Sequence, residues 1–272
     1  MNYIIKLCIS VLLVSQALAK EDATFSEVLA QSSVPATQRH IYGAAPEQFY
    51  LRWQQADDAP LLIFIHGGCW LDAYDIEHAK PLMSAFYEAG FTVIGLEYRR
   101  TTDEHAGWPI ARDDIINGLQ KAVTDTTYAT ERPIAIVGHS AGGHLALLAA
   151  TQASQWAPSL NINVHGLAAI VDVATYAQGD NSCQQATLRF MGDSPAIIPE
   201  IYKSASPLSY QMPSNIEVIL WHGNEDKIVP IKQASYPNAS VNTTQHAGHF
   251  AWIHTQTTAY KSLLQNLLER AL

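Results

Sequence analysis

Apolar residues follow two periods along this chain, one typical of strands and one typical of helices. Continuous apolar runs, which indicate strands buried on both faces, lie at 60–68, 91–98, 133–139, 164–173 and 216–223. Further strands are expected at 47–53, which alternates apolar and polar residues, and at 240–247. Amphipathic stretches predict helices at 76–89, 109–123, 140–152 and 251–272. This alternation predicts an α/β protein with a mostly parallel sheet and helices on both faces.

Two segments depart from the alternation. Residues 20–45 form a polar lead-in with turn residues, and the folded domain is expected over 46–272. Residues 174–213 separate two strands, and an insert of this length is usually functional. It predicts a small cap or pocket wall, with candidate lining residues Phe190, Met191 and Tyr202, or else a surface excursion with a small core of its own.

The first nineteen residues have the pattern of a cleavable signal peptide. Lys6 precedes an apolar run, and Ala17-Leu18-Ala19 is the small-x-small ending that signal peptidase cuts. A membrane anchor is the alternative, but the apolar run is shorter than the ~20 residues that a spanning helix needs. We therefore expect a secreted or periplasmic mature chain that begins at Lys20 and keeps no membrane anchor.

Composition narrows the classes of partner. The 272 residues are 48% hydrophobic and carry a net charge of −9, and loss of the signal peptide removes one further positive charge. A negative surface repels phosphate backbones and anionic lipid. The chain also contains no basic run, no metal-type cysteine spacing and no phosphate-loop string. We expect no nucleic-acid partner, no metal and no cofactor.

Two cysteines remain after the signal peptide, Cys69 and Cys183. In an oxidising compartment they could form a disulfide that ties the insert over Cys69. Two free thiols are equally compatible with the sequence, because a disulfide requires α-carbons within ~7 Å.

The string "GHSAG" at 138–142 lies between a predicted strand and a predicted helix. A sharp turn there would lift the Ser140 hydroxyl above the edge of the sheet, and Gly138 and Gly142 suit the close packing of such a turn. Ser140 is therefore the candidate nucleophile.

A serine nucleophile needs a base, and the base needs an acid that fixes its tautomer. Asp226 follows the predicted strand 216–223, and His249 precedes the last predicted helix. The order Ser140, Asp226, His249 is the order of nucleophile, acid and base in α/β-hydrolases. Of the rival groups, Glu225 is expected to be solvated, His246 and His254 to pack or face solvent, and Asp172 comes one strand too early.

Backbone amides are the expected donors to the oxyanion that forms on attack. Ala141 follows the nucleophile at a helix start, and the string "HGGCW" at 66–70 offers the amides of Gly68 and Cys69. His66 is expected to brace this loop.

With these motifs in place, the chain resembles an α/β-hydrolase-fold serine esterase. It is similar to the group that holds BD-FAE-like (feruloyl and acetyl-xylan type) esterases, hormone-sensitive-lipase-like enzymes and kynurenine formamidases. The resemblance covers about 47–270 and rests on "HGGCW", "EYRR", "GHSAGGHLAL", "HGNEDKIVP" and "AGHF". It implies Ser140, Asp226 and His249 as catalytic triad and the amides of Gly68, Cys69 and Ala141 as oxyanion hole.

Two departures concern the substrate. Cys69 stands where the lipase-like pattern has a third glycine, and together with Trp70 it gives the HGGxW string of the formamidases. We expect hydrolysis of small or medium acyl esters. An arylformamidase and a non-catalytic binding protein of the same fold are the alternatives.

Overall fold

The computed structural model describes residues 20–126, 133–157 and 159–271. The predicted signal peptide, residues 1–19, lies outside the described residues. The strands are β1 (Gln38–Ile41), β2 (Phe49–Trp53), β3 (Leu61–Ile65), β4 (Thr92–Leu96), β5 (Ile134–His139), β6 (Ile162–Leu167), β7 (Ile216–Gly223) and β8 (Ser240–Thr244). The α-helices are α1 (Phe25–Leu29), α2 (Lys80–Glu88), α3 (Ile110–Asp125), α4 (Ala141–Thr151), α5 (Ala153–Trp156), α6 (Val173–Tyr176), α7 (Ser182–Met191), α8 (Pro199–Ala205) and α9 (Thr258–Arg270).

The described strands form one sheet of eight in the order β1-β2-β4-β3-β5-β6-β7-β8. β2 is antiparallel to both β1 and β4, and every other neighbouring pair is parallel. This confirms the expected α/β class with a mostly parallel sheet. The carboxyl ends of β3, β5, β7 and β8 consequently meet along one edge, where parallel sheets carry their functional groups.

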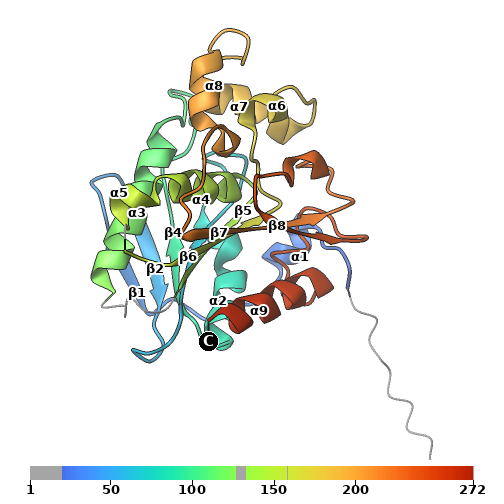
Figure 1. Ribbon diagram of the computed structural model, residues 1–272. Coiled ribbons are helices and arrows are strands. Elements are labelled where there is room, and N and C mark those ends of the chain that lie inside the picture. The colour runs from blue at the N-terminus through green and yellow to red at the C-terminus, as the bar shows by residue number, and fades with distance from the viewer. Residues whose placement is uncertain (1–19, 127–132, 158, 272) are drawn as a thin grey trace, which may run out of the picture.

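The sheet separates two apolar layers, because successive side chains of a strand point to opposite faces. In β3, Ile63 and Ile65 join the cluster that packs on α3 and α4, whereas Leu62 and Phe64 join the cluster that packs on α2 and α9. Figure 1 shows the helices on both sides of the sheet. The arrangement explains why the central strands consist of continuous apolar runs.

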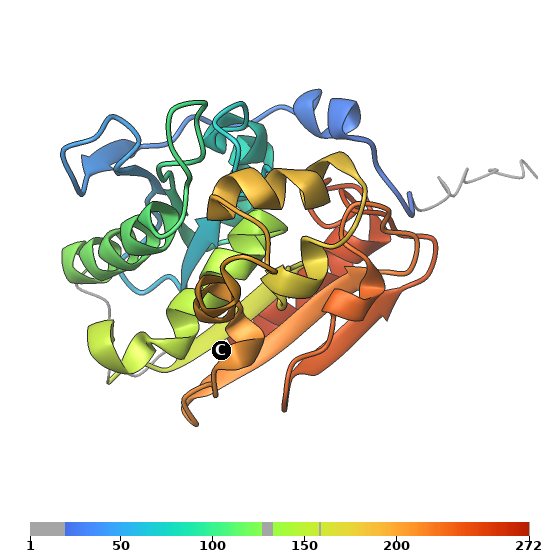
Figure 2. The ribbon, with the colours of Figure 1, turned by 90° about the horizontal axis from the view of Figure 1, so that it is seen from above.

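The insert between β6 and β7 is a small helical cap. It contains α6, α7 and α8, which gather at one end of the molecule above α4 in Figure 1 and spread over its centre in Figure 2. The candidate lining residues Phe190, Met191 and Tyr202 are at most 4% exposed and belong to the main apolar cluster. These three residues therefore pack the cap onto the main apolar cluster of the domain.

Several predicted boundaries are wrong for a common reason. β6 ends at Leu167, although the apolar run continues to 173, because 168–171 are a buried loop that leads into the cap. The last helix begins at Thr258, whose predecessor Thr257 caps it by accepting a hydrogen bond from the Tyr260 amide. The residues 251–257 are mostly buried turns. Burial alone does not distinguish such loops from regular elements.

The lead-in 20–45 contains α1 and β1, which the sequence pattern does not indicate. β1 is an edge strand of mostly polar and mostly exposed residues. Its stability comes from backbone pairing with β2, so it has no apolar face to detect. None of the helices in the described part of the chain has the length and apolar composition of a transmembrane span.

Candidate active site

Ser140 occupies a strained turn between β5 and α4. Its backbone has φ 55° and ψ −119°, outside the regions that non-glycine residues normally adopt. The turn is held because the Ser140 amide donates to the Leu167 carbonyl at 2.8 Å. A side chain at Gly138 would press into the Gly142 backbone, and one at Gly142 into the backbone of the loop after β3. Such an elbow projects the Ser140 side chain away from the strand.

Asp226 and His249 form a hydrogen-bonded pair at the same edge of the sheet. Asp226 lies in the loop after β7, here called the acid loop (residues 224–230), and His249 follows β8. His249 Nδ1 lies 2.8 Å from Asp226 Oδ2, and both side chains are at most 6% exposed. An ionised carboxylate only accepts, so Nδ1 carries the hydrogen and Nε2 is the acceptor of the neutral ring. This is the tautomer that a base beside a serine requires.

The Asp226 carboxylate is held in its ionised form. Burial alone would raise its pKa, but His249, the Val229 amide and His222 together lower the pKa below its usual value. The Ile228 and Val229 amides each donate to Oδ1 at 2.8 Å. One carboxylate oxygen therefore anchors the acid in its loop, and the other is left for His249.

The Ser140 hydroxyl makes no hydrogen bond within the described residues, so the structure does not join it to His249 directly. The two loops meet through His139 instead: its Nε2 donates to the His249 carbonyl at 3.0 Å, and the two rings lie 4.7 Å apart. Burial, followed by the neighbouring His249, holds the pKa of His139 well below its usual value. Without substrate, nucleophile and base often lie beyond hydrogen-bond distance.

The loop after β3, here called the glycine loop (residues 66–70), has an unusual backbone. Gly68, Cys69 and Trp70 have consecutive positive φ angles of 116°, 54° and 59°. Positive φ angles turn the backbone sharply away from the path of β3, and successive amides in such a turn are able to bind a negative charge. Ala141 contributes another amide, because the first N–H groups of α4 have no partner within the helix. The residues expected to form an oxyanion hole thus lie on adjacent strand ends, β3 and β5.

A buried ion network lies beneath the glycine loop. Glu97, directly after β4, accepts hydrogen bonds from His66 Nε2 at 3.0 Å, from the Ile76 amide at 2.9 Å and from Arg100. Burial would raise the pKa of Glu97, but His66, Arg100 and the Tyr98 amide lower it to about 2. The Tyr98 hydroxyl also donates to the His66 carbonyl at 3.0 Å. These contacts fix the first residue of the glycine loop.

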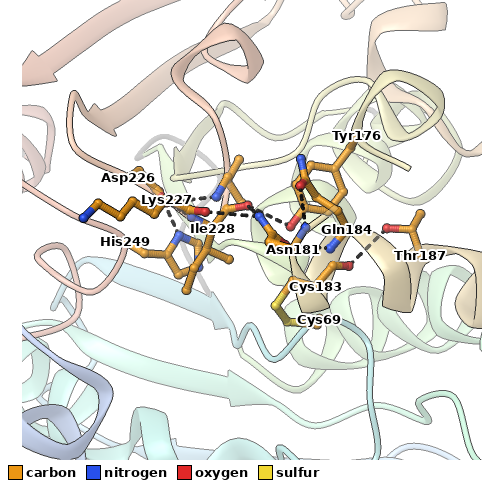
Figure 3. Close-up of a disulfide and its surroundings, with 11 residues drawn as sticks. Cys69, Tyr176, Asn181, Cys183, Gln184, Thr187, Asp226, Lys227, Ile228 and His249 are labelled. Atoms are coloured by element: carbon orange, nitrogen blue, oxygen red, sulfur yellow. Dashed lines mark hydrogen bonds and ion pairs between the residues drawn. A yellow bond between two sulfur atoms is a disulfide. The ribbon is translucent and has the colours of Figure 1, made fainter. Parts of the chain in front are cut away.

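The structure joins Cys69 and Cys183 in a disulfide with α-carbons 5.2 Å apart. The bond connects the glycine loop to α7 of the cap, and Figure 3 draws it in one view with the Asp226–His249 pair. Trp70 extends the same contact: its ring stacks on Phe190 of α7 at 4.6 Å, and its Nε1 donates to His144 at 3.1 Å. The glycine loop is therefore held by the cap above and by Glu97 below.

The rival acids of the sequence analysis have other partners. Asp172 caps α6 by accepting from the Thr175 amide at 3.1 Å, and Glu225 pairs with His246 at 2.9 Å on the surface.

A hollow of about 1000 Å³ lies at the amino ends of β5, β6 and β7, the opposite edge of the sheet from Ser140. The described residues contain no cluster of three or more His, Cys, Asp or Glu side chains that could hold a metal.

Sequence reasoning did not single out three residues that shape the site: Glu97, Asn181 and Asp22. Glu97 could have been found as an acid directly after a buried apolar strand, since such charges are normally paired. Asn181 forms a capping box with Gln184, and the sequence spacing indicates that feature. Asp22, which accepts from the Gly248 amide at 2.9 Å, has no local signal because its partner is distant in sequence.

An elbow serine after β5, an acid after β7 and a histidine after β8 define a protein of the α/β-hydrolase fold. The chain belongs to the BD-FAE family, whose model matches residues 48–239. Curated relatives are similar over much of this chain. Esterase LipC of Mycobacterium tuberculosis is 26% identical over 216 residues, which are 72% of this chain and 52% of LipC. Esterase LipQ of the same organism is 28% identical over 191 residues, 65% of this chain and 44% of LipQ.

The chain thus spans about half the length of the curated relatives it matches. Solved structures match it over almost its whole length. A truncated carbohydrate esterase from gut microbiota has a TM-score of 0.68 at 17% identity, over 89% of this chain and 99% of that one. Esterase B from Lactobacillus rhamnosis has a TM-score of 0.68 at 16% identity, over 90% of this chain and 89% of that one. At these identities the likeness shows the fold.

Proposed function

We propose that this protein is a serine carboxylesterase. Ser140 attacks the acyl carbon of an ester, His249 Nε2 takes the hydroxyl proton, and Asp226 stabilises the imidazolium that forms. The amides of Gly68, Cys69 and Ala141 bind the oxyanion of the tetrahedral intermediate. His249 then returns the proton to the leaving alcohol, and an acyl-enzyme on Ser140 remains. A water activated by His249 hydrolyses this intermediate and restores the serine.

The observation that carries the proposal is the Asp226–His249 hydrogen bond of 2.8 Å at the sheet edge that also bears the Ser140 elbow. The pair comes from the loops after β7 and β8, and its geometry leaves His249 Nε2 free to accept a proton. Membership of the BD-FAE family and similarity to esterases of Mycobacterium tuberculosis support ester hydrolysis over other uses of the fold.

The substrate is an ester with a small or medium acyl group. Ser140 is only 3% exposed, and the cap is bonded to the glycine loop beside it. A long acyl chain would have to displace these contacts. We further propose that the mature protein acts outside the cytoplasm as a secreted or periplasmic enzyme. The signal-peptide pattern of residues 1–19 and the Cys69–Cys183 disulfide support this location.

A panel of p-nitrophenyl esters of increasing acyl length tests the proposal with the mature chain. We expect turnover of short and medium esters and labelling by a fluorophosphonate probe. Ser140→Ala should abolish labelling and lower kcat by about 10⁴-fold or more, since the acyl-enzyme can no longer form.

Asp226→Asn should lower kcat by a similar order, because an amide no longer fixes the correct tautomer of His249. The matched control is Glu225→Gln, which changes the adjacent but exposed carboxylate and should keep wild-type kcat. Esterase activity that persists in Ser140→Ala would overturn the proposal. Efficient hydrolysis of N-formylkynurenine without ester hydrolysis would point to an arylformamidase instead.

A further inference from the structure

The first turn of α7 contacts two loops of the site from one short stretch of chain. Asn181 is the N-cap residue of α7, and Cys183 lies two residues further on. Asn181 bonds to the acid loop, and Cys183 is bonded to Cys69 in the glycine loop. Figure 3 shows both contacts together with the Asp226–His249 pair. The cap thus touches two parts of the site that are distant in sequence.

The two ends of the Asn181 side chain have different partners. Its Oδ1 accepts from the Gln184 amide at 2.9 Å, which is the ordinary bond of an N-cap residue. Its Nδ2 donates to the Lys227 carbonyl at 3.1 Å and to the Ile228 carbonyl at 2.9 Å. The Tyr176 hydroxyl donates to the same Ile228 carbonyl at 3.2 Å. Capping requires only the bond from the Gln184 amide to Oδ1. The two bonds that Nδ2 donates are additional and hold the acid loop.

The carbonyls that Asn181 holds belong to the peptide groups that hold Asp226. The Lys227 carbonyl shares a planar peptide group with the Ile228 N–H, and the Ile228 carbonyl shares one with the Val229 N–H. Both of these N–H groups donate to Asp226 Oδ1 at 2.8 Å. A hydrogen bond on either carbonyl therefore fixes the plane that aims the opposite N–H at the acid. Asp226 Oδ2 is then directed to His249.

The disulfide gives the second contact of the same turn. Cys69 has φ 54°, a conformation that a residue with a side chain adopts at an energetic cost. Its amide is one of the proposed oxyanion donors, so its orientation affects the transition state directly. The covalent bond to Cys183 holds this residue against α7.

We propose that the first turn of α7 positions the catalytic machinery from both sides. Asn181 is a positioning residue that orients Asp226 through the acid loop, and Cys183 fixes the Cys69 amide through the disulfide. The cap is then a structural part of catalysis and not only a cover for the substrate. The inference rests on the proposed serine esterase function, because it concerns the geometry of that triad and oxyanion hole.

The titratable groups around Asp226 come from several elements. His249 and His222 lie 2.8 and 3.7 Å from its Oδ2. Tyr176 of α6 and His139 of β5 also interact with its charge. None of these side chains is changed by Asn181→Ser, which also adds no charge, so a shift in the pH dependence of that variant reports the position of Asp226.

Two substitutions at Asn181 separate positioning from capping. Serine and aspartate cap helices about as well as asparagine, but serine does not reach the acid loop and aspartate presents no donor to it. If Asn181 only caps α7, Asn181→Ser keeps wild-type kinetics, and Asn181→Asp departs from them only through its added negative charge. If it positions Asp226, we expect kcat/KM on a short p-nitrophenyl ester to fall by about 10- to 100-fold, mainly in kcat.

In Asn181→Ser the acidic limb of the pH profile of kcat/KM should also move to lower pH. A displaced Asp226 stabilises the protonated imidazole less, so the neutral base persists at lower pH. The matched control is Ser182→Ala, an exposed position next to Asn181 that should leave both rate and profile unchanged. A folded Asn181→Ser variant with wild-type rate and profile would overturn the role of Asn181.

Tyr176→Phe provides a second measurement that leaves the cap of α7 intact. It removes the other donor to the Ile228 carbonyl. We expect a smaller loss of kcat/KM in the same direction, with the same movement of the acidic limb. If Asn181→Ser does not fold, an unchanged pH profile in Tyr176→Phe would contradict the proposal.

The disulfide arm uses the double variant Cys69→Ser/Cys183→Ser. We expect kcat to fall by about 10-fold or more without movement of the acidic limb, because the oxyanion donor is loosened while Asp226 stays in place. An unchanged kcat would overturn the role of Cys183. If the wild-type protein hydrolyses esters and all variants match it, only this inference is refuted. If the wild-type protein shows neither activity nor fluorophosphonate labelling, the proposed function is refuted and the inference with it.

Discussion

At the residue scale, Glu97 shows how a buried charge is tolerated beneath the site. Its carboxylate is 3% exposed and is paired with both His66 and Arg100. Its pKa of about 2 lies below the usual value of 4.5. A depressed carboxyl pKa stabilises the folded state above the unfolded value, and this stabilisation is lost as pH falls through the folded value. The contribution of Glu97 should therefore disappear between about pH 4.5 and pH 2.

This predicts the behaviour of Glu97→Gln. At neutral pH the variant should be less stable by about 3–5 kcal/mol, because Arg100 keeps its buried charge without a carboxylate. It should also show a weaker loss of stability than the wild type as pH falls below 4.5. Urea unfolding over a pH series measures both effects. Glu104→Gln, at an exposed position, is the control, and equal pH slopes for Glu97→Gln and the wild type would contradict the prediction.

At the scale of elements, the sequence predicts those strands and helices whose burial and periodicity leave a regular pattern of apolar residues. The central strands and the elbow follow from continuous apolar runs and from glycines at close approaches, so Ser140, Asp226 and His249 could be placed at strand ends. Edge strand β1 could not be predicted in this way, because its residues are mostly exposed and show no apolar pattern. Asn181 and Asp22 act through partners 46 or more residues away, and local pattern carries no information on such contacts.

The N-terminal segment, residues 20–31, is held by contacts of this long-range kind. Its Lys20 backbone pairs with Thr257 and Thr258 near the start of α9, and Gln31 accepts from the Thr255 amide at 2.8 Å. Between them Asp22 accepts from the Gly248 amide at 2.9 Å, directly before His249. Figure 1 shows α1 beside the C-terminal part of the chain. The segment therefore supports the loop that carries the proposed base.

We expect Asp22→Ala to lower kcat/KM by several-fold, because the His249 loop loses a charge-assisted hydrogen bond worth about 1.5–3 kcal/mol. Glu21→Ala is the matched control, because Glu21 accepts from the Thr258 hydroxyl at 2.6 Å, at the start of α9 and not in the His249 loop. Steady-state kinetics on a short ester compare the two variants. Equal activity of Asp22→Ala and Glu21→Ala would show that the bond to Gly248 does not support catalysis.

At the scale of the whole molecule, the site is assembled from parts that span most of the chain. The glycine loop, the elbow, the acid loop and the His249 loop follow β3, β5, β7 and β8, and the cap joins two of them. Parallel strands bring these loops to one edge without covalent links. The disulfide adds such a link between cysteines 114 positions apart, and the segment between them includes β4, β5 and β6.

The disulfide closes a long loop of the chain, so we expect it to contribute strongly to the free energy of unfolding. In the chain-entropy description, closing about 100 residues restricts the unfolded state by up to about 4.7 kcal/mol, and native disulfides typically contribute 2–5 kcal/mol. We expect Cys69→Ser/Cys183→Ser to lower the free energy of unfolding by about 3–5 kcal/mol, measured by urea unfolding of the mature chain. Wild-type protein treated with reductant should match the variant, since both unfold to an open chain. If the oxidised wild type and the double variant unfold at the same urea concentration, the bond does not constrain the unfolded chain, and the stabilising role assigned to the disulfide is wrong.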